Sequence, residues 1–92
     1  MRLRYKARAL RDIEAVHQYI AENDPQAARR VIARIEYAIQ RLSRLPLSGR
    51  PSKVPGTRIL AVPGLPYIVV HRVSDDAVDI VAVFHTARQH RY

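Results

Sequence analysis

Positively charged side chains dominate the residues of this sequence that could do chemistry. The 16 Lys and Arg outnumber the 8 Asp and Glu, and all of these cations except Lys6 and Lys53 are Arg. The guanidinium group is a planar fork of donors that fits phosphate and carboxylate groups. Residues 45–74 contain no acid and four cations, Arg50, Lys53, Arg58 and Arg72. Because unpaired like charges repel, the cluster predicts a site for phosphate or for an acidic protein segment, against the simpler alternative of a solvated basic loop.

A second reactive group lies near the C-terminus and consists of His85, Arg88 and Tyr92. Histidine titrates near neutral pH, and tyrosine can donate a proton. Attack of a ribose 2′-OH on the adjacent 3′-phosphate needs such an acid–base pair and cations on the phosphoryl oxygens, a set that Arg58, His85 and Arg88 could supply. If Phe84 faces the core, His85 faces the open side of the sheet. The alternative is that His85 is an ordinary edge residue.

Other chemical motifs are missing from the sequence. His71 lies in the middle of a β-branched segment, where a hydrogen-bonded structural role is the usual one. No spacing of His, Asp or Glu is typical of a metal site, and there is no glycine-rich phosphate loop or serine-hydrolase motif. We therefore expect no metal and no cofactor.

Hydrophobic periodicity predicts the elements that position these groups. Apolar and charged residues alternate in residues 3–6, as in a half-buried strand that pairs with a later one. Apolar residues at steps of three and four predict helices over residues 9–21 and 25–45. Asp24 is expected to cap the second helix, with Pro25 in its first turn.

Three β-branched segments predict strands over residues 57–62, 67–73 and 78–85. Short turns make neighbouring strands antiparallel, so these strands form a meander, and the helical hairpin covers one face of the sheet. The order β-α-α-β-β-β predicts an α+β fold, formed by residues 1–92 as a single domain. The other face of the sheet stays open, and we expect the functional groups there.

Composition narrows the class of protein. The chain has 92 residues, a formal net charge of +8 and 48% hydrophobic residues, which indicates a folded, basic domain. The lack of cysteine excludes a disulfide scaffold and fits a reducing cytosol. No apolar run reaches the roughly 20 residues that a membrane helix needs, so we expect a cytoplasmic protein without a membrane partner.

The order and spacing of these segments resemble the RelE/ParE superfamily of bacterial toxins, over essentially the whole chain and most closely its ParE-like branch. The similarity rests on Asp-Pro at the second helix, Gly-Arg-Pro at residues 49–51, and the segments 56–60, 66–73 and 81–89. The resemblance implies a toxin of a type II toxin–antitoxin pair. RelE-like members cut mRNA in the ribosomal A site, whereas ParE-like members poison DNA gyrase.

The resemblance also implies roles for single residues. Arg58 matches the strand arginine that RelE-type enzymes place on the scissile phosphate, and His85 and Arg88 match the region that carries a proton-transfer group and a second arginine. Lys53 matches only loosely a loop that is richer in lysine in the nucleases, and Tyr92 lies past the position of their tail tyrosine. This incomplete nuclease set favours the ParE-like branch.

We therefore expect a ParE-like toxin that inhibits growth by binding a large target, DNA gyrase, and that forms a hetero-oligomer with a cognate antitoxin. The antitoxin is expected to neutralise it with an acidic, amphipathic C-terminal segment. The residues expected to bind the target or the antitoxin are Arg50, Lys53, Arg58, Arg72, Arg88 and Tyr92. One alternative is a RelE-like, ribosome-dependent mRNA interferase with Arg58, His85 and Arg88 as catalytic residues. The other is an inactive basic binding module.

Overall fold

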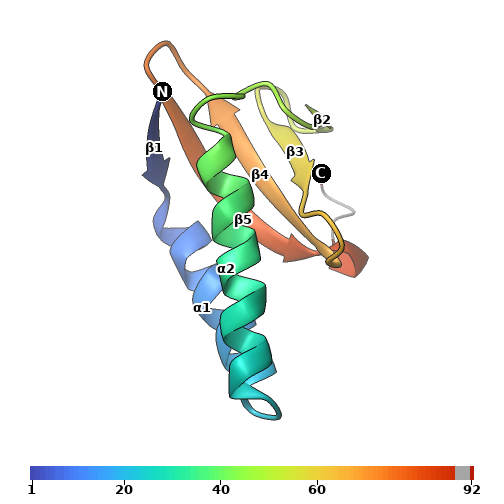
Figure 1. Ribbon diagram of the computed structural model, residues 1–92. Helices are drawn as coiled ribbons and strands as arrows, with labels where there is room; N and C mark the ends of the chain where they lie inside the picture. Colours follow the sequence, from blue (N-terminus) through green and yellow to red (C-terminus); the bar gives the residue numbers. More distant parts are fainter. Residues whose placement is uncertain (89–91) are drawn as a thin grey trace.

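The computed structural model describes residues 1–88 and 92 (Figure 1). The elements in chain order are β1 (Arg2–Tyr5), α1 (Ala7–Ala21), α2 (Pro25–Arg41), β2 (Arg50–Pro51), β3 (Arg58–Ala61), β4 (Tyr67–Val73), β5 (Ala77–His85) and the 3-10 helix η1 (Thr86–Arg88). Both helices lie on one face of the sheet, so the predicted α+β architecture is confirmed (Figure 1). Within the described residues, no helix is both long and apolar enough to span a lipid bilayer.

The second helix begins where the sequence predicts and ends earlier. The Asp24 carboxylate accepts a hydrogen bond from the Ala27 amide at 3.0 Å, which is the predicted N-cap. The helix ends at Arg41, before the predicted boundary. Directly after it, the Ser43 hydroxyl donates to the Gln40 carbonyl at 2.8 Å. Such local side-chain bonds compete with the helical ladder and favour the turns that follow α2.

The sheet has the strand order β1-β5-β4-β3-β2. β1 runs parallel to β5, and the other neighbouring strands are antiparallel, so the first strand pairs with a later one as predicted. β2 is a two-residue strand within a segment for which the sequence predicts a loop. Among the described residues, β2 pairs only with the start of β3, at Arg58 and Ile59.

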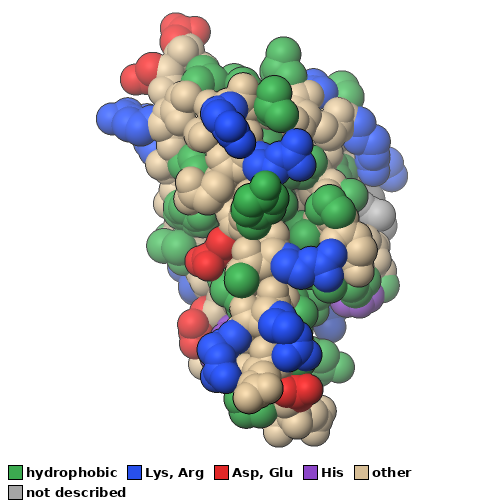
Figure 2. Space-filling view, viewed as in Figure 1, with side chains coloured by type: hydrophobic (Ala, Val, Ile, Leu, Met, Phe, Trp, Pro, Cys, Tyr) green, Lys and Arg blue, Asp and Glu red, His purple; other side chains and the backbone are tan. Residues whose placement is uncertain are grey.

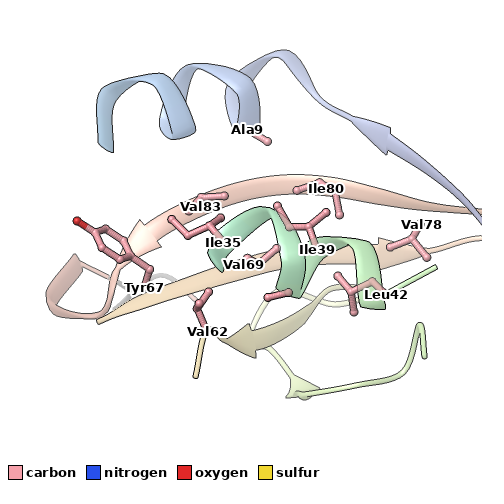
Figure 3. Close-up of a cluster of buried hydrophobic side chains, with 11 residues drawn as sticks. Ala9, Ile35, Ile39, Leu42, Val62, Tyr67, Val69, Val78, Ile80 and Val83 are labelled. Atoms are coloured by element: carbon pink, nitrogen blue, oxygen red, sulfur yellow. The ribbon is translucent and has the colours of Figure 1, made fainter. Parts of the chain in front are cut away.

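Apolar side chains of the helices pack on one face of the sheet, hereafter the inner face (Figure 3). Ile35 and Ile39 of α2 and its C-cap residue Leu42 pack in one cluster with strand residues such as Val69 and Ile80, and all five are fully buried. Each such side chain stabilises the fold by about 1.5–3 kcal/mol relative to exposure. The opposite side, hereafter the outer face, carries a second cluster of Ile59, Ile68, Val70, Ala82 and Tyr92.

A β-bulge in β5 changes the face of the sheet on which the last side chains of this strand lie. The register between β4 and β5 shifts between Val70 and His71. Val70 lies opposite Ala82, whereas the next residue, His71, lies opposite Ile80. Val81 is thus an extra residue in β5. Since side chains alternate across a strand, one inserted residue moves every later side chain to the other face.

The end of β5 accordingly differs from the prediction. Phe84 lies on the outer face, with its ring centroid 5.3 Å from that of Tyr92. His85 lies opposite Tyr67 on the inner face, in an edge-on arrangement with 5.5 Å between ring centroids. Phe84 therefore does not face the helix-covered core, and the placement of His85 on the open face, which depended on that condition, is wrong, because hydrophobic alternation does not reveal the bulge.

Candidate functional site

The outer face of the sheet is covered at its centre by the chain itself. Val54, from the loop before β3, and Tyr92 pack on the cluster that contains Ile59 and Val70, and Tyr92 is only 7% exposed. The Tyr92 carbonyl accepts a hydrogen bond from the Lys53 amide at 3.0 Å. The expectation of a fully open face is therefore wrong, and candidate functional groups lie around this covered centre.

Three of the predicted cations surround the covered centre, and they are called the outer cations below: Arg50, Lys53 and Arg72. Arg50 lies opposite Ile59 in the register and so shares the outer face, while Lys53 and Arg72 are exposed on the loop and on β4. A Cβ atom on Gly56, whose φ is +82°, would lie 3.6 Å from the Arg72 Nε atom. The loop that carries Lys53 therefore runs beside the Arg72 guanidinium.

Hydroxyl groups fix the loop that carries Lys53. The hydroxyl oxygens of Ser52 and Thr57 lie 2.6 Å apart, and the Thr57 hydroxyl donates to the Val54 carbonyl at 2.8 Å. The Ser52 hydroxyl accepts from the Val54 amide at 2.9 Å. These bonds satisfy backbone groups of the loop, so the loop holds Val54 against the sheet while the exposed Lys53 faces solvent.

The carboxylate on this part of the outer face is already paired. Asp79 lies opposite Arg72, but its Oδ1 atom accepts a hydrogen bond from the Arg4 Nε at 2.7 Å. This hydrogen bond holds the pKa of Asp79 below its usual value and raises the pKa of Arg4. In the part of the chain that the structure describes, neither Arg50, Lys53 nor Arg72 forms an ion pair. The charge of Arg72 also lowers the pKa of Asp79, as the last of several causes, and all three cations remain exposed to an anionic partner.

Arg58 lies on the inner face, away from the outer cations. Its Nη2 atom donates to the carbonyls of Leu47 at 2.9 Å and Gly49 at 3.2 Å. Its Nε atom is buried without a hydrogen-bond partner among the described residues. The prediction that Arg58 faces the uncovered side is wrong, because Ile59 takes the outer face and strand alternation turns Arg58 inward. Arg58 instead ties the segment after α2 to the sheet.

His71 lies opposite Arg58 and completes a buried polar cluster on the inner face. Its side chain is fully buried, and its Nε2 atom donates to the Pro46 carbonyl at 3.0 Å. Burial lowers the pKa of His71, the bond to Pro46 opposes this effect, and the charge of Arg58 adds to it. His71 therefore has the hydrogen-bonded structural role that its place in the sequence predicts.

The three residues of the nuclease hypothesis do not meet at one site. Arg58 lies opposite His71, whereas His85 lies opposite Tyr67 at the other end of β4. Tyr67 and His71 are four positions apart in β4, which offsets the two pairings by roughly 13 Å along the strand at about 3.3 Å per residue. Arg88, exposed at the end of η1, lies near His85 in the chain and not near Arg58. The register thus places Arg58 and His85 at opposite ends of β4 and does not bring them together.

A groove that the sequence does not indicate lies between α2 and β3. Its volume is about 490 Å³. Arg34, Tyr37 and Arg41 of α2 contribute to its walls, and Tyr37 is 67% exposed. Its apolar lining comes from both elements and from the residues directly after them: Ala38, Leu42, Leu60 and Val62. Residues distant in the chain form this groove, so local periodicity could not predict it.

These features define a small, basic α+β protein of the RelE/ParE type, with a helical hairpin on one face of the sheet. The chain is 43% identical over 88 residues to Y4kP of Sinorhizobium fredii, covering 96% of this chain and 91% of that protein. It is 36% identical over 81 residues to toxin RelE2 of Caulobacter vibrioides, covering 88% and 90%. The solved structure of the chromosomal ParDE toxin–antitoxin system from P. aeruginosa matches with a TM-score of 0.82 and 26% identity, covering 92% and 95%.

The family model described as the ParE toxin of the type II toxin–antitoxin system parDE matches residues 3–90. The chain therefore belongs to the ParE family of type II toxin–antitoxin toxins. The resemblance inferred from the sequence and the predicted fold class are both confirmed.

Proposed function

We propose that this protein inhibits growth by binding DNA gyrase and that a cognate antitoxin neutralises it. One observation carries the proposal, namely the division of the cations between the two faces. The outer cations have no ion pairs within the described residues, whereas Arg58 is bonded inside the fold and pairs with β4 at the opposite end from His85, an offset of roughly 13 Å along the strand. Since RNA cleavage needs a phosphate-binding arginine and a proton-transfer group at one phosphate, this division favours binding over cleavage.

The proposed target surface works through electrostatic attraction. Arg50, Lys53 and Arg72 lie around one covered centre, and Arg88 is a further exposed cation near the end of β5. Cations of one sign on one surface raise the rate of association with an anionic partner. Tyr92 is proposed to act indirectly, because it packs against the loop of Lys53. Gyrase is a cytoplasmic enzyme, so the proposed location of this toxin is the cytoplasm.

The antitoxin is proposed to act through an acidic, amphipathic segment in a hetero-oligomer with the toxin. Its carboxylates would pair with arginines that the fold leaves unpaired, and its apolar side chains would cover exposed apolar surface. Removing one partner from a desolvated Arg–carboxylate pair costs about 2–5 kcal/mol, so single substitutions should weaken neutralisation measurably.

Regulated expression in a bacterial host tests the proposed function. We expect growth arrest with a DNA-damage response and with intact mRNA. The name of the relative RelE2 points to the alternative, a ribosome-dependent mRNA interferase, which predicts transcripts cut within translated frames soon after induction. Cut transcripts would contradict gyrase binding. Normal growth of cells that contain the folded protein would favour the inactive binding module. Co-expression of the neighbouring reading frame should restore growth if that frame encodes the antitoxin.

A further inference from the structure

The N-terminal segment adds two cations to the outer face of the sheet. Leu3 and Tyr5 of β1 pack against the core cluster on the inner face. Because side chains alternate along a strand, Arg4 points to the outer face. Lys6 continues the extended backbone of β1, with φ −71° and ψ 151°, and its amide donates to the Ile80 carbonyl at 2.9 Å. Lys6 therefore lies on the same face as Arg4.

The register brings Arg4 close to one of the outer cations. Arg4 of β1 lies opposite Asp79 of β5, and Asp79 lies opposite Arg72 of β4. These three strands are direct neighbours in the sheet (Figure 1). At about 4.8 Å between neighbouring strands, the Cα atoms of Arg4 and Arg72 are roughly 10 Å apart. Two long cationic side chains thus flank one carboxylate on the outer face.

This carboxylate faces three cations, Arg4, Lys6 and Arg72, which are called the β1–β4 cations below. The hydrogen bond from Arg4 is the main cause that lowers the pKa of Asp79, burial opposes it, and the charges of all three cations lower the pKa further. Within the described residues, Arg4 forms an ion pair with Asp79, whereas Lys6 and Arg72 form none. The group therefore keeps a net positive charge after Asp79 is counted.

The bond to Asp79 leaves the outer nitrogen atoms of Arg4 unoccupied. Arg4 donates through Nε, which lies 2.7 Å from the Asp79 Oδ1 atom. In the part of the chain that the structure describes, its Nη1 and Nη2 atoms form no hydrogen bond. The Arg4 side chain is 48% exposed, whereas that of Asp79 is 10% exposed. Asp79 thus holds a guanidinium group whose remaining donors can bind two oxygens of one phosphate.

The shape of the surface favours a polyanion over a small anion. The β1–β4 cations are exposed, and none of them lines the groove between α2 and β3 or the smaller hollow beside Arg50. Small ligands are usually held in concave pockets. A nucleic-acid backbone needs no pocket, because it binds through several phosphates at once. Arg50 and Lys53 are further exposed cations around the same face, so one polyanion can contact them together with the β1–β4 cations.

Cations on the helix side of the molecule are arranged differently. Figure 2 shows Lys and Arg side chains spread over α2 and separated by apolar ones. Arg34 of α2 donates to the Pro63 carbonyl. Among the described residues, no arginine of α2 forms an ion pair with a carboxylate. The helix side therefore supplies control positions of the same charge, such as the exposed Arg29.

We propose that Arg4, Lys6 and Arg72 bind the phosphodiester backbone of duplex DNA. Arg4 donates from its Nη atoms to the oxygens of one phosphate, and Lys6 and Arg72 neutralise that phosphate and its neighbours. None of these contacts reads a base, so binding does not depend on the DNA sequence. The choice of duplex DNA among nucleic acids rests on the proposed function, because gyrase acts on duplex DNA, whereas phosphate binding itself does not.

Fluorescence anisotropy of the purified protein with two short, labelled duplexes of unrelated sequence tests the ligand. We expect saturable binding of equal strength to both, which weakens as the salt concentration rises because DNA releases counterions. The competitors, at constant ionic strength, are inorganic phosphate and polyglutamate, and we expect neither to displace the DNA. Displacement by inorganic phosphate would indicate a small-anion site, and displacement by polyglutamate would indicate a site for acidic proteins. Either result, or no DNA binding, would overturn the proposal.

Neutral substitutions test the residues. Lys6→Gln and Arg72→Gln each remove a cation without an ion pair in the described structure. We expect each to weaken DNA binding about fivefold and to reduce the salt dependence by about one phosphate contact. Arg4→Gln should do the same, and circular dichroism checks its fold because it leaves Asp79 without its partner. Arg29→Gln changes the net charge equally and should bind within about twofold of the parent. Equal losses in Arg29→Gln and Lys6→Gln would mean that net charge alone explains the binding.

The DNA assay separates this inference from the proposed function. If the chain binds DNA through the β1–β4 cations but does not inhibit gyrase, the proposed function fails and the phosphate site stands. If the chain inhibits gyrase but does not bind DNA, and Lys6→Gln inhibits as fully as the parent, the phosphate site fails and the proposed function stands.

Discussion

Arg58 and Arg72 come from the same acid-free stretch of the chain, yet the fold uses them differently. Arg58 lies opposite His71, the residue next to Arg72, so the two arginines occupy neighbouring positions on adjacent strands. Arg58 points to the inner face and donates to two carbonyls, whereas Arg72 is exposed on the outer face. Net charge thus locates a cationic region, and strand alternation decides which cations a partner can reach.

The largest expected effect is the loss of stability in Arg58→Ala. This variant loses the bonds to the carbonyls of Leu47 and Gly49, and hydrogen bonds to charged groups contribute about 1.5–3 kcal/mol. We expect the free energy of unfolding, measured by urea titration, to fall by about 2 kcal/mol. Arg72→Ala is the matched control and should stay within about 0.5 kcal/mol of the parent. Equal losses in both variants would remove the distinction between the two arginines.

The next effect concerns activity. Arg72→Ala and Lys53→Ala each remove an exposed cation without an ion pair in the described structure, so they should leave stability unchanged. We expect each to weaken target binding about tenfold, which corresponds to about 1.4 kcal/mol. The measurement is the expression level needed for growth arrest, with protein amounts quantified by immunoblot. Arg11→Ala, an exposed cation on α1, is the control. If the control loses as much activity as the other two, net charge alone matters.

The smallest expected effect is a pH dependence of stability from the buried cluster around Arg58. Burial holds the pKa of His71 below its usual 6.5 in the folded chain. As the pH falls below 6.5, the unfolded chain takes up a proton that the folded chain does not, so stability decreases toward the folded-state pKa. His71→Gln, whose amide can donate to the Pro46 carbonyl, should flatten the profile in this range. Thermal unfolding over a pH series checks this, and a flat parent profile would contradict it.

Asp79 on the outer face makes stability depend on pH in a second, more acidic range. Its hydrogen bond from Arg4 holds its pKa below the usual 3.8, so it stabilises the fold above pH 3.8 and this contribution disappears as the pH falls further. His71→Gln should leave this second decrease intact. Asp79→Asn should remove the decrease in stability below pH 3.8. Together the two variants assign the less acidic decrease to the inner face and the more acidic one to the outer face.

Local signals in the sequence were sufficient for most of the fold. The Asp24 cap and the apolar periodicity place α1 and α2, and the β-branched segments place β4 and β5, because each depends on residues close together in the chain. The end of α2 was misplaced, since the Ser43 hydroxyl bonds to the Gln40 carbonyl in the following turn. The bounds of a helix or strand were thus predictable where local propensity and capping residues define them.

The candidate site was predictable only in part. The acid-free stretch located the outer cations, but not the faces on which they lie. The bulge at Val81 exchanges the faces on which Phe84 and His85 lie, and no local sequence pattern indicates this bulge. The covering of the outer face by Tyr92 and the groove between α2 and β3 arise from contacts between distant segments. Such features depend on tertiary packing, about which the hydrophobic periodicity of the sequence carries no information.

The most direct test of the central claim measures binding of the purified protein to DNA gyrase and inhibition of gyrase supercoiling. The parent is compared with Lys53→Glu/Arg72→Glu, which reverses two outer cations, and with Arg58→Lys, which keeps the inner charge. We predict that the parent and folded Arg58→Lys bind and inhibit gyrase, while the folded double variant does neither. Full inhibition by the double variant, or loss of inhibition only in folded Arg58→Lys, would contradict the assignment of the target surface to the outer face.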